Sequence, residues 1–217
     1  MELHYKKAPL YRYFFLLSGL TLFALGNAIA VKVLHVGLHP WEVMNVALYE
    51  RIGFTIGTWN VIIGILLVTV VYFFSRSYIH IGTFCNALLI GPIMDFFLWL
   101  DILPKATHTW MDYFILLSGI MITGIGGGLY VAAGLGAGPR DGFMLAISDR
   151  TGLSVAKARI MVESIVLIIG FLLGGPIFIM TFIYTFIQSP VFQKSLQFFK
   201  GIVSVMEEKK SMANTVN

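Results

Sequence analysis

Long apolar segments separated by short polar connections cover most of the 217-residue chain. An α-helix rises about 1.5 Å per residue, so about 20 apolar residues cross the roughly 30 Å hydrocarbon core of a bilayer. Six segments reach this length, the fifth only marginally: 13–35, 59–75, 79–100, 113–134, 158–174 and 177–197. The first is too long for a signal-peptide core and is interpreted as a span. The pattern predicts an all-α, polytopic membrane protein with six transmembrane helices.

Two further segments, 40–53 and 139–152, have helix boundaries but are too short to span a membrane. Each opens with Pro, carries an acidic residue at its third position, and closes with Arg and, two residues later, Gly. Pro and an acid suit a helix N-terminus, and Gly suits the position after a helix end. About 12 helical residues reach only about 18 Å. We therefore expect two half-helices, either lying in the membrane interface or entering the bundle as re-entrant elements.

The chain contains this pattern twice, about a hundred residues apart. The sequence YFFLLSG at 13–19 reappears as YFILLSG at 113–119, and the two half-helices align with each other. Because each copy holds three spans, the second must insert upside down, an arrangement typical of transporters. The predicted boundaries are a cytoplasmic N-terminus 1–12, a first repeat 13–100, an extracytoplasmic linker 101–112, a second repeat 113–197 and a cytoplasmic tail 198–217.

Composition supports membrane insertion and indicates the orientation. Hydrophobic residues make up 58% of the chain and charged residues 12%, with a mean hydropathy of +0.84, whereas soluble domains carry about 25% charged residues. The net charge is +4, but the basic residues lie between apolar segments, so we expect no nucleic-acid partner. With the N-terminus inside, only Lys32, Arg51 and Lys105 of the 15 Lys and Arg residues fall outside. This asymmetry predicts a multi-pass protein of the cytoplasmic (plasma) membrane with both termini in the cytoplasm.

No motif for catalysis, cofactor binding or metal binding stands out. The single cysteine, Cys85, lies in an apolar run and has no intrachain disulfide partner. His35 and His39 flank Gly37, and we interpret them as ordinary interfacial histidines, with a metal-binding or pH-sensing role as the alternative. The sequence has no nucleophile elbow, no HExxH pair and no phosphate-binding loop. We therefore expect a protein that is not an enzyme and that has no cofactor and no metal site.

Four motifs resemble a known family. GLHPWEV at 37–43, GTW at 57–59, GTFCN at 82–86 and GLGAGPRDG at 134–142 are similar to the YczE/YyaS/YitT group of bacterial membrane proteins, most of all to its YczE branch. The resemblance covers residues 13–197 and departs in the last span, where a more glycine-rich pattern is replaced. It implies a polytopic bacterial inner-membrane protein but no defined activity.

The strongest candidate for ligand binding is the glycine-rich loop at 134–142. Glycines let the main chain approach a ligand, a helix N-terminus favours anions, and Arg140 adds a bidentate donor. Trp41 and Glu42 occupy the equivalent positions of Arg140 and Asp141 in the first repeat. The predicted solute-binding residues are Gly136, Gly138, Arg140, Asp141, Trp41, Glu42, Asn45 and Asn86. The alternatives are a tight turn, with Arg140 paired to Asp141 or to a lipid phosphate, and asparagines that join helices by hydrogen bonds.

Two acidic residues, Asp95 and Glu163, fall within predicted spans. An ionised carboxylate is unfavourable there unless it is paired or hydrated, so both are candidates for coupling transport to protons. Glu163 follows Arg159 by four residues, so an ion pair on one helix face is the alternative for Glu163. Asp95 has no cationic neighbour in its own segment.

Together these features favour a secondary transporter of a small solute, with an anionic or carboxylate-bearing solute suggested by the Arg140 loop. Two other interpretations stay open. One is a solute-binding membrane subunit of a larger transport complex, and the other is an accessory or assembly factor for cell-envelope or secondary-metabolite machinery. The expected partners are the lipid bilayer and the solute, with a homodimer or a partner membrane protein left open.

Overall fold

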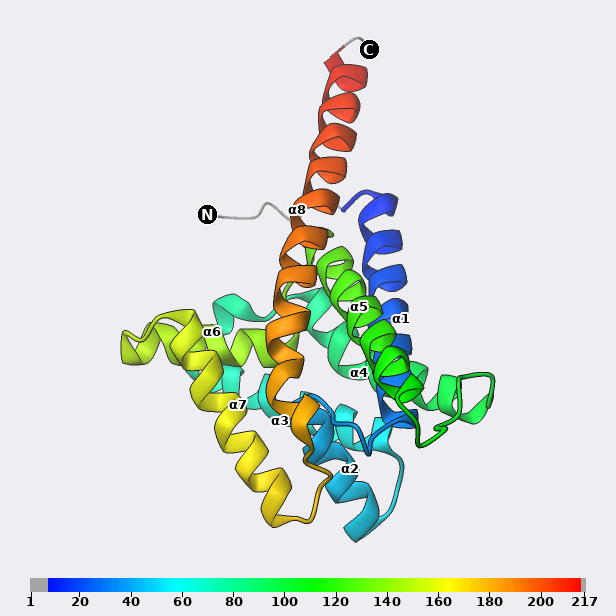
Figure 1. The fold of residues 1–217 in the computed structure, drawn as a ribbon. Coiled ribbons are helices and arrows are strands. Elements are labelled where there is room, and N and C mark those ends of the chain that lie inside the picture. The colour runs from blue at the N-terminus through cyan, green and yellow to red at the C-terminus, as the bar shows by residue number, and fades with distance from the viewer. Residues whose placement is uncertain (1–7, 216–217) are drawn as a thin grey trace.

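The computed structural model describes residues 8–215, so residues 1–7 of the predicted N-terminal segment and residues 216–217 of the predicted tail lie outside the described residues. Over that range the chain is all-helical, as predicted (Figure 1). The helices are α1 (Leu10–Lys32), α2 (Pro40–Ile52), α3 (Ile56–Phe74), α4 (Ile81–Trp99), α5 (Met111–Ala132), α6 (Pro139–Thr151), α7 (Val155–Leu172) and α8 (Ile179–Thr215), with a short 3₁₀ helix η1 (Arg76–Tyr78).

Each predicted span coincides with one of the longer helices, namely α1, α3, α4, α5, α7 and α8. Within residues 8–215, four of these helices are long and apolar enough to cross a membrane: α1, α3, α4 and α5. α7 is not among them, because its 18 residues carry three charged side chains, Lys157, Arg159 and Glu163. The fold is thus all-helical, with four candidate membrane-spanning helices.

α8 continues well past the predicted end of the sixth span at residue 197. No proline follows Pro190, so nothing in the sequence breaks the helix there. Arg12 at the start of α1 donates to the Ala133 carbonyl oxygen at 3.2 Å, just after α5, and also forms an ion pair with Glu207 of α8. The predicted tail 198–217 therefore begins as helix, and Arg12 ties it to α1 and α5.

The two predicted half-helices are present as α2 and α6, and each ends at a glycine, Gly53 and Gly152. His39 precedes α2, and its Nδ1 accepts a hydrogen bond from the Trp41 backbone N–H at 3.4 Å. In α2 the first eight residues are buried and the last residues are exposed. The N-terminus of α2 therefore points into the protein and its C-terminus reaches the surface.

Glycines bring α1 and α5 into close contact, and the two helices lie side by side in Figure 1. A Cβ added at Gly19 would lie 2.8 Å from the Gly126 carbonyl oxygen, and one added at Gly26 would lie 2.6 Å from the Gly119 carbonyl oxygen. The earlier glycine of α1 thus meets the later glycine of α5, and the later one meets the earlier, so the two helices are antiparallel. Glycines thus allow the two helices to pack at close range.

Each half-helix packs against a long helix of the other half of the chain. α2 contacts α7, and α6 contacts α3. A second apolar cluster, separate from the main core, joins these four helices: Trp41, Met44, Leu67, Met144, Val162 and Val166. The starts of α2 and α6 are thereby brought toward the middle of the molecule, where the candidate site lies.

Candidate functional site

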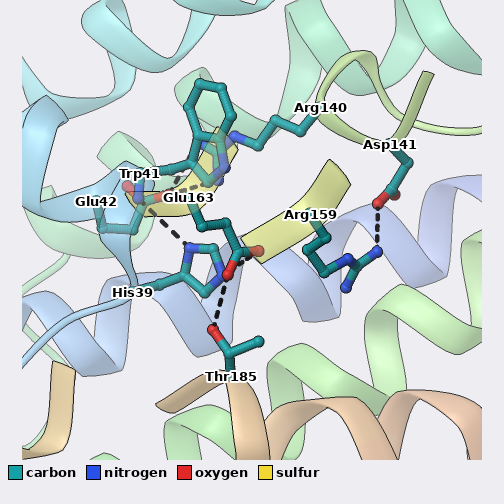
Figure 2. A network of polar contacts seen from close by, with 8 residues as sticks. All are labelled: His39, Trp41, Glu42, Arg140, Asp141, Arg159, Glu163 and Thr185. Carbon is teal, nitrogen blue, oxygen red and sulfur yellow. Dashed lines mark hydrogen bonds and ion pairs between the residues drawn. The ribbon is translucent and has the colours of Figure 1, made fainter. Parts of the chain in front are cut away.

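A cavity of about 80 Å³ lies where the starts of the two half-helices approach each other. Residues from α1, α2, α3, α4, α5, α6, α7 and α8 contribute to its wall: Phe23, Asn27, His39, Trp41, Asn60, Asn86, Ile90, Tyr130, Gly138, Arg140, Asp141, Met144, Arg159, Glu163, Gln188, Ser189 and Phe192. Both halves of the sequence therefore build one site. Figure 2 shows its charged residues at close range.

A buried ion pair connects the first turns of α2 and α6. Nη1 and Nη2 of Arg140 donate to Glu42 Oε1 at 3.1 and 3.0 Å. Asn45 Nδ2 donates to the other carboxylate oxygen of Glu42 at 2.9 Å. The Arg140 guanidinium also lies 5.1 Å from the centroid of the Trp41 ring, a cation–π contact. The predicted alternative of an Arg140–Asp141 pair is wrong, because neighbouring residues of a helix point in different directions.

Asp141 instead pairs with Arg159 of α7. Arg159 Nη2 donates to Asp141 Oδ1 at 3.0 Å, and Tyr130 OH donates to Asp141 Oδ2 at 3.3 Å (Figure 2 shows the Asp141–Arg159 pair). The expected Arg159–Glu163 ion pair is therefore a wrong prediction. Arg159 faces the first turn of α6, whereas Glu163, one turn later on α7, faces α8 and the start of α2.

Glu163 lies in the cavity wall with polar neighbours and no arginine bonded to it. Thr185 Oγ1 of α8 donates to Glu163 Oε2 at 3.1 Å, and His39 Nε2 lies 3.7 Å from Glu163 Oε1 (Figure 2). Burial, together with the positive charges of Arg140 and Arg159, lowers the pKa of His39 to about 3. His39 is therefore a neutral imidazole at neutral pH.

Three N–H donors in the cavity wall have no hydrogen-bond partner among the described residues: Asn27 Nδ2, Asn60 Nδ2 and Trp41 Nε1. These side chains are only 3%, 7% and 2% exposed. Sequence reasoning missed Asn60 and Tyr130. Asn60 could have been found as a polar residue inside an otherwise apolar predicted span.

The structure brings most of the predicted site residues together. Gly138, Arg140, Asp141, Trp41, Asn86 and Glu163 line the cavity. Glu42 and Asn45 are connected to the wall through Arg140: Arg140 donates a hydrogen bond to Glu42, and Asn45 donates another to the same carboxylate. Gly136 is not part of the wall, and its role is to shape the loop.

The glycine-rich loop is held against α4. Gly136 has φ of 125°, and Gly134 has φ of 66°, conformations that favour glycine. The Gly82 N–H donates to the Leu135 carbonyl oxygen at 2.8 Å, and Thr83 Oγ1 donates to the Ala137 carbonyl oxygen at 2.8 Å. This anchoring places Gly138 and Arg140 at the cavity.

Asp95 lies apart from the cavity wall. Its carboxylate accepts hydrogen bonds from Thr55 Oγ1 at 2.5 Å and from the Gly57 N–H at 2.9 Å. It thus fastens the start of α3 to α4 and satisfies an N–H group of the first turn of α3. Its proposed part in proton coupling stays a prediction.

The two predicted interfacial histidines have separate surroundings. His35 Nε2 lies 2.9 Å from Asp112 Oδ2, and its ring lies 4.4 Å, centroid to centroid, from that of His108. His39 belongs to the cavity. Within the described part of the chain, no group of His, Cys, Asp and Glu side chains is placed to hold a metal ion.

Comparisons with known proteins agree with the predicted resemblance. The family of unknown function DUF6198 matches residues 10–197. The uncharacterized membrane protein YczE of Bacillus subtilis (strain 168) is 38% identical over 173 residues, 79% of this chain and 79% of YczE. An uncharacterized protein of Haemophilus influenzae is 32% identical over 190 residues, 87% of this chain and 83% of that protein. YyaS of Bacillus subtilis is 23% identical over 169 residues, 76% of this chain and 83% of YyaS.

No solved structure matches the chain. The apolar helices and the similarity to a membrane protein agree on a multi-pass membrane location. The family match covers all the helices described above except the end of α8. The chain belongs to the YczE-like family DUF6198.

Proposed function

We propose that this protein is a secondary transporter of the cytoplasmic membrane and that its small solute binds in the cavity. The observation that carries the proposal is the Glu42–Arg140 ion pair, which joins the first turns of two half-helices inside an apolar bundle. Charged residues at membrane depth are unfavourable and mark functional sites. Transporters commonly form their solute sites from interrupted helices at the interface between repeats.

The architecture that we infer is a pair of inverted repeats with three spans and one half-helix each. The contacts Gly19–Gly126 and Gly26–Gly119 support it, because a two-fold axis that relates the repeats exchanges one contact with the other. The contacts of α2 with α7 and of α6 with α3 are exchanged in the same way. The buried start of α2 supports re-entrant half-helices, and the Lys and Arg distribution supports cytoplasmic termini.

The ion pair gives the transporter a means of changing access to the cavity. Glu42 and Arg140 belong to different half-helices, so separating the pair lets α2 and α6 move apart. The solute is small and anionic or carboxylate-bearing, since three N–H donors of the polar wall have no partner among the described residues. Glu163 is the coupling residue, because its carboxylate reaches the cavity without a bonded arginine.

The test is solute uptake by the purified protein in proteoliposomes, with a panel of small anions and amino acids. We expect the wild type to take up at least one solute. The double variant Glu42→Gln/Arg140→Gln lacks the buried ion pair, and its uptake rate should be lower by about tenfold or more. Asp101→Asn is the control, because Asp101 lies at the surface, where it pairs with Lys32 and Lys105.

Two results would replace this proposal. A solute that binds the purified protein but is never moved by it would indicate a solute-binding subunit of a larger transport complex. If no solute binds or moves, an accessory or assembly factor for cell-envelope or secondary-metabolite machinery becomes the better explanation.

A further inference from the structure

The polar wall of the cavity contains hydrogen-bond donors without partners. Asn27, Asn60 and Trp41 come from α1, α3 and α2, and each has a buried N–H group with no partner among the described residues. The amide oxygen of Asn27 lies 3.4 Å from Thr123 Oγ1, whose single proton is shared with the Gly119 carbonyl oxygen at 2.9 Å. Buried donors are unfavourable unless they meet an acceptor. A solute rich in acceptor oxygens would supply these acceptors.

The two arginines of the cavity are already matched by carboxylates. Arg140 is bonded to Glu42 and Arg159 to Asp141, one acid for each cation. Glu163 is the third carboxylate, and it has no cation of its own. With all five groups charged, the site carries one negative charge more than positive charges. An anion therefore binds only when Glu163 is neutral.

The groups that face Glu163 are consistent with a neutral carboxyl. Thr185 of α8 donates to it, and His39, before α2, lies 3.7 Å away. Arg159 precedes it by one turn on α7 but is bonded to Asp141 on α6, and Arg140 on α6 is bonded to Glu42.

The cavity also limits the size of the solute. Its volume of about 80 Å³ is roughly half that of the 150 Å³ cavity that admits benzene. A solute of about three or four non-hydrogen atoms fits this space.

We propose that the cavity binds a small monovalent oxyanion of the formate, acetate or nitrate class through the neutral N–H donors of Asn27, Asn60 and Trp41, and that Glu163 takes up one proton as the anion binds. The proton comes from solvent and forms an O–H bond on a Glu163 carboxylate oxygen, so the net charge of the site is unchanged. This inference rests on the proposed function, since it takes the cavity to be the solute site.

The test is thermal stability of the full-length protein in detergent, titrated with potassium formate, acetate and nitrate. Potassium chloride at equal ionic strength, ammonium chloride and acetamide are the comparison compounds. Binding to the native state raises the melting temperature by mass action. We expect saturable stabilisation by at least one oxyanion at about pH 5.5, weaker at about pH 7.5.

Three variants identify the groups responsible. Trp41→Phe removes the indole N–H but keeps a ring beside Arg140, and Asn60→Leu removes an amide donor. Each should weaken oxyanion binding by about tenfold, the value of one hydrogen bond to a charged group. Glu163→Gln should keep binding and remove its pH dependence. Thr69→Val, an exposed position on α3, is the control and should change nothing.

Stabilisation by ammonium instead of oxyanions, or by none of these compounds, would overturn the inference. The same holds if both Trp41→Phe and Asn60→Leu bind oxyanions as the wild type does, or if Glu163→Gln retains the pH dependence. Oxyanion binding without uptake into proteoliposomes would leave this inference standing and reject the transporter. If the protein takes up a solute whose affinity is the same in these variants as in the wild type, the inference is rejected and the proposed transport function stands.

Discussion

At the scale of single residues, Glu42 shows how a buried charge depends on its neighbours. Its side chain is 1% exposed, and its oxygens accept hydrogen bonds from Arg140 and Asn45. A carboxylate removed from water is tolerated where charge-assisted hydrogen bonds replace its hydration. The effect of replacing one of these residues therefore depends on which charges remain.

We expect Arg140→Gln alone to lower the free energy of unfolding by about 3–5 kcal/mol, because Glu42 is left buried without a counter-ion. The double variant Glu42→Gln/Arg140→Gln buries no unpaired charge and should be more stable than Arg140→Gln alone. Thermal and denaturant unfolding in detergent measure both. Lys105→Gln, which breaks an exposed pair with Asp101, is the control and should leave the stability nearly unchanged. A double variant less stable than the single one would contradict this account.

His39 gives a prediction for the dependence of stability on pH. Its folded-state pKa of about 3 lies below the unfolded value of about 6.5, so the unfolded chain binds more protons between these pH values. Neutral His39 therefore contributes its full share of the free energy of unfolding above about pH 6.5, and this contribution is lost as the pH falls toward 3. We expect His39→Gln to flatten the fall in melting temperature over this range. Parallel pH profiles for variant and wild type would show that His39 does not contribute.

At the scale of helices, the contact between α1 and α5 depends on the absence of side chains. The backbone of one helix occupies the space where a Cβ of the other would lie, at Gly19, Gly26, Gly119 and Gly126. In a membrane the hydrophobic effect does not drive helices together, so this close packing is a main source of their association.

The same substitution should therefore have opposite effects in two helices. Gly126→Ala introduces a Cβ 2.7 Å from the Gly19 carbonyl oxygen and should destabilise the protein by about 1–3 kcal/mol. Gly201→Ala in α8 meets nothing within 4 Å and should stabilise by about 0.5–1 kcal/mol, since Ala favours helix more than Gly. The melting temperature of each variant, compared with that of the wild type, measures these two effects. Equal effects would show that propensity and not packing governs Gly126.

Features that depend on local chemistry were predictable from the sequence, and those that depend on tertiary partners were not. The half-helices and their ends at Gly53 and Gly152 follow from residues within a few positions of each boundary. The choice of Asp141 over Glu163 as the partner of Arg159 depends on how α6 lies against α7, which spacing within one helix does not contain. Asn60 enters the site only because α3 packs beside α6.

At the scale of the whole molecule, the inverted-repeat architecture makes a direct topological prediction. In a Cys85→Ser background, cysteines introduced at Lys105 and Lys157 should react with a membrane-impermeant reagent from opposite sides of the membrane. Both side chains are exposed, Lys105 in the connection between α4 and α5 and Lys157 at the start of α7. Labelling of both positions from the same side would exclude the inverted arrangement.

α8 has one further consequence for the whole molecule. Its 37 residues form a rod about 55 Å long. Thr185 on this rod touches Glu163 in the cavity, and Glu207, more than twenty residues later on the same helix, touches Arg12. Displacement of Thr185 therefore moves the distant end of the rod. The emission of a fluorophore attached near Glu207 would therefore report a movement of α8 at Glu163, without any label inside the cavity.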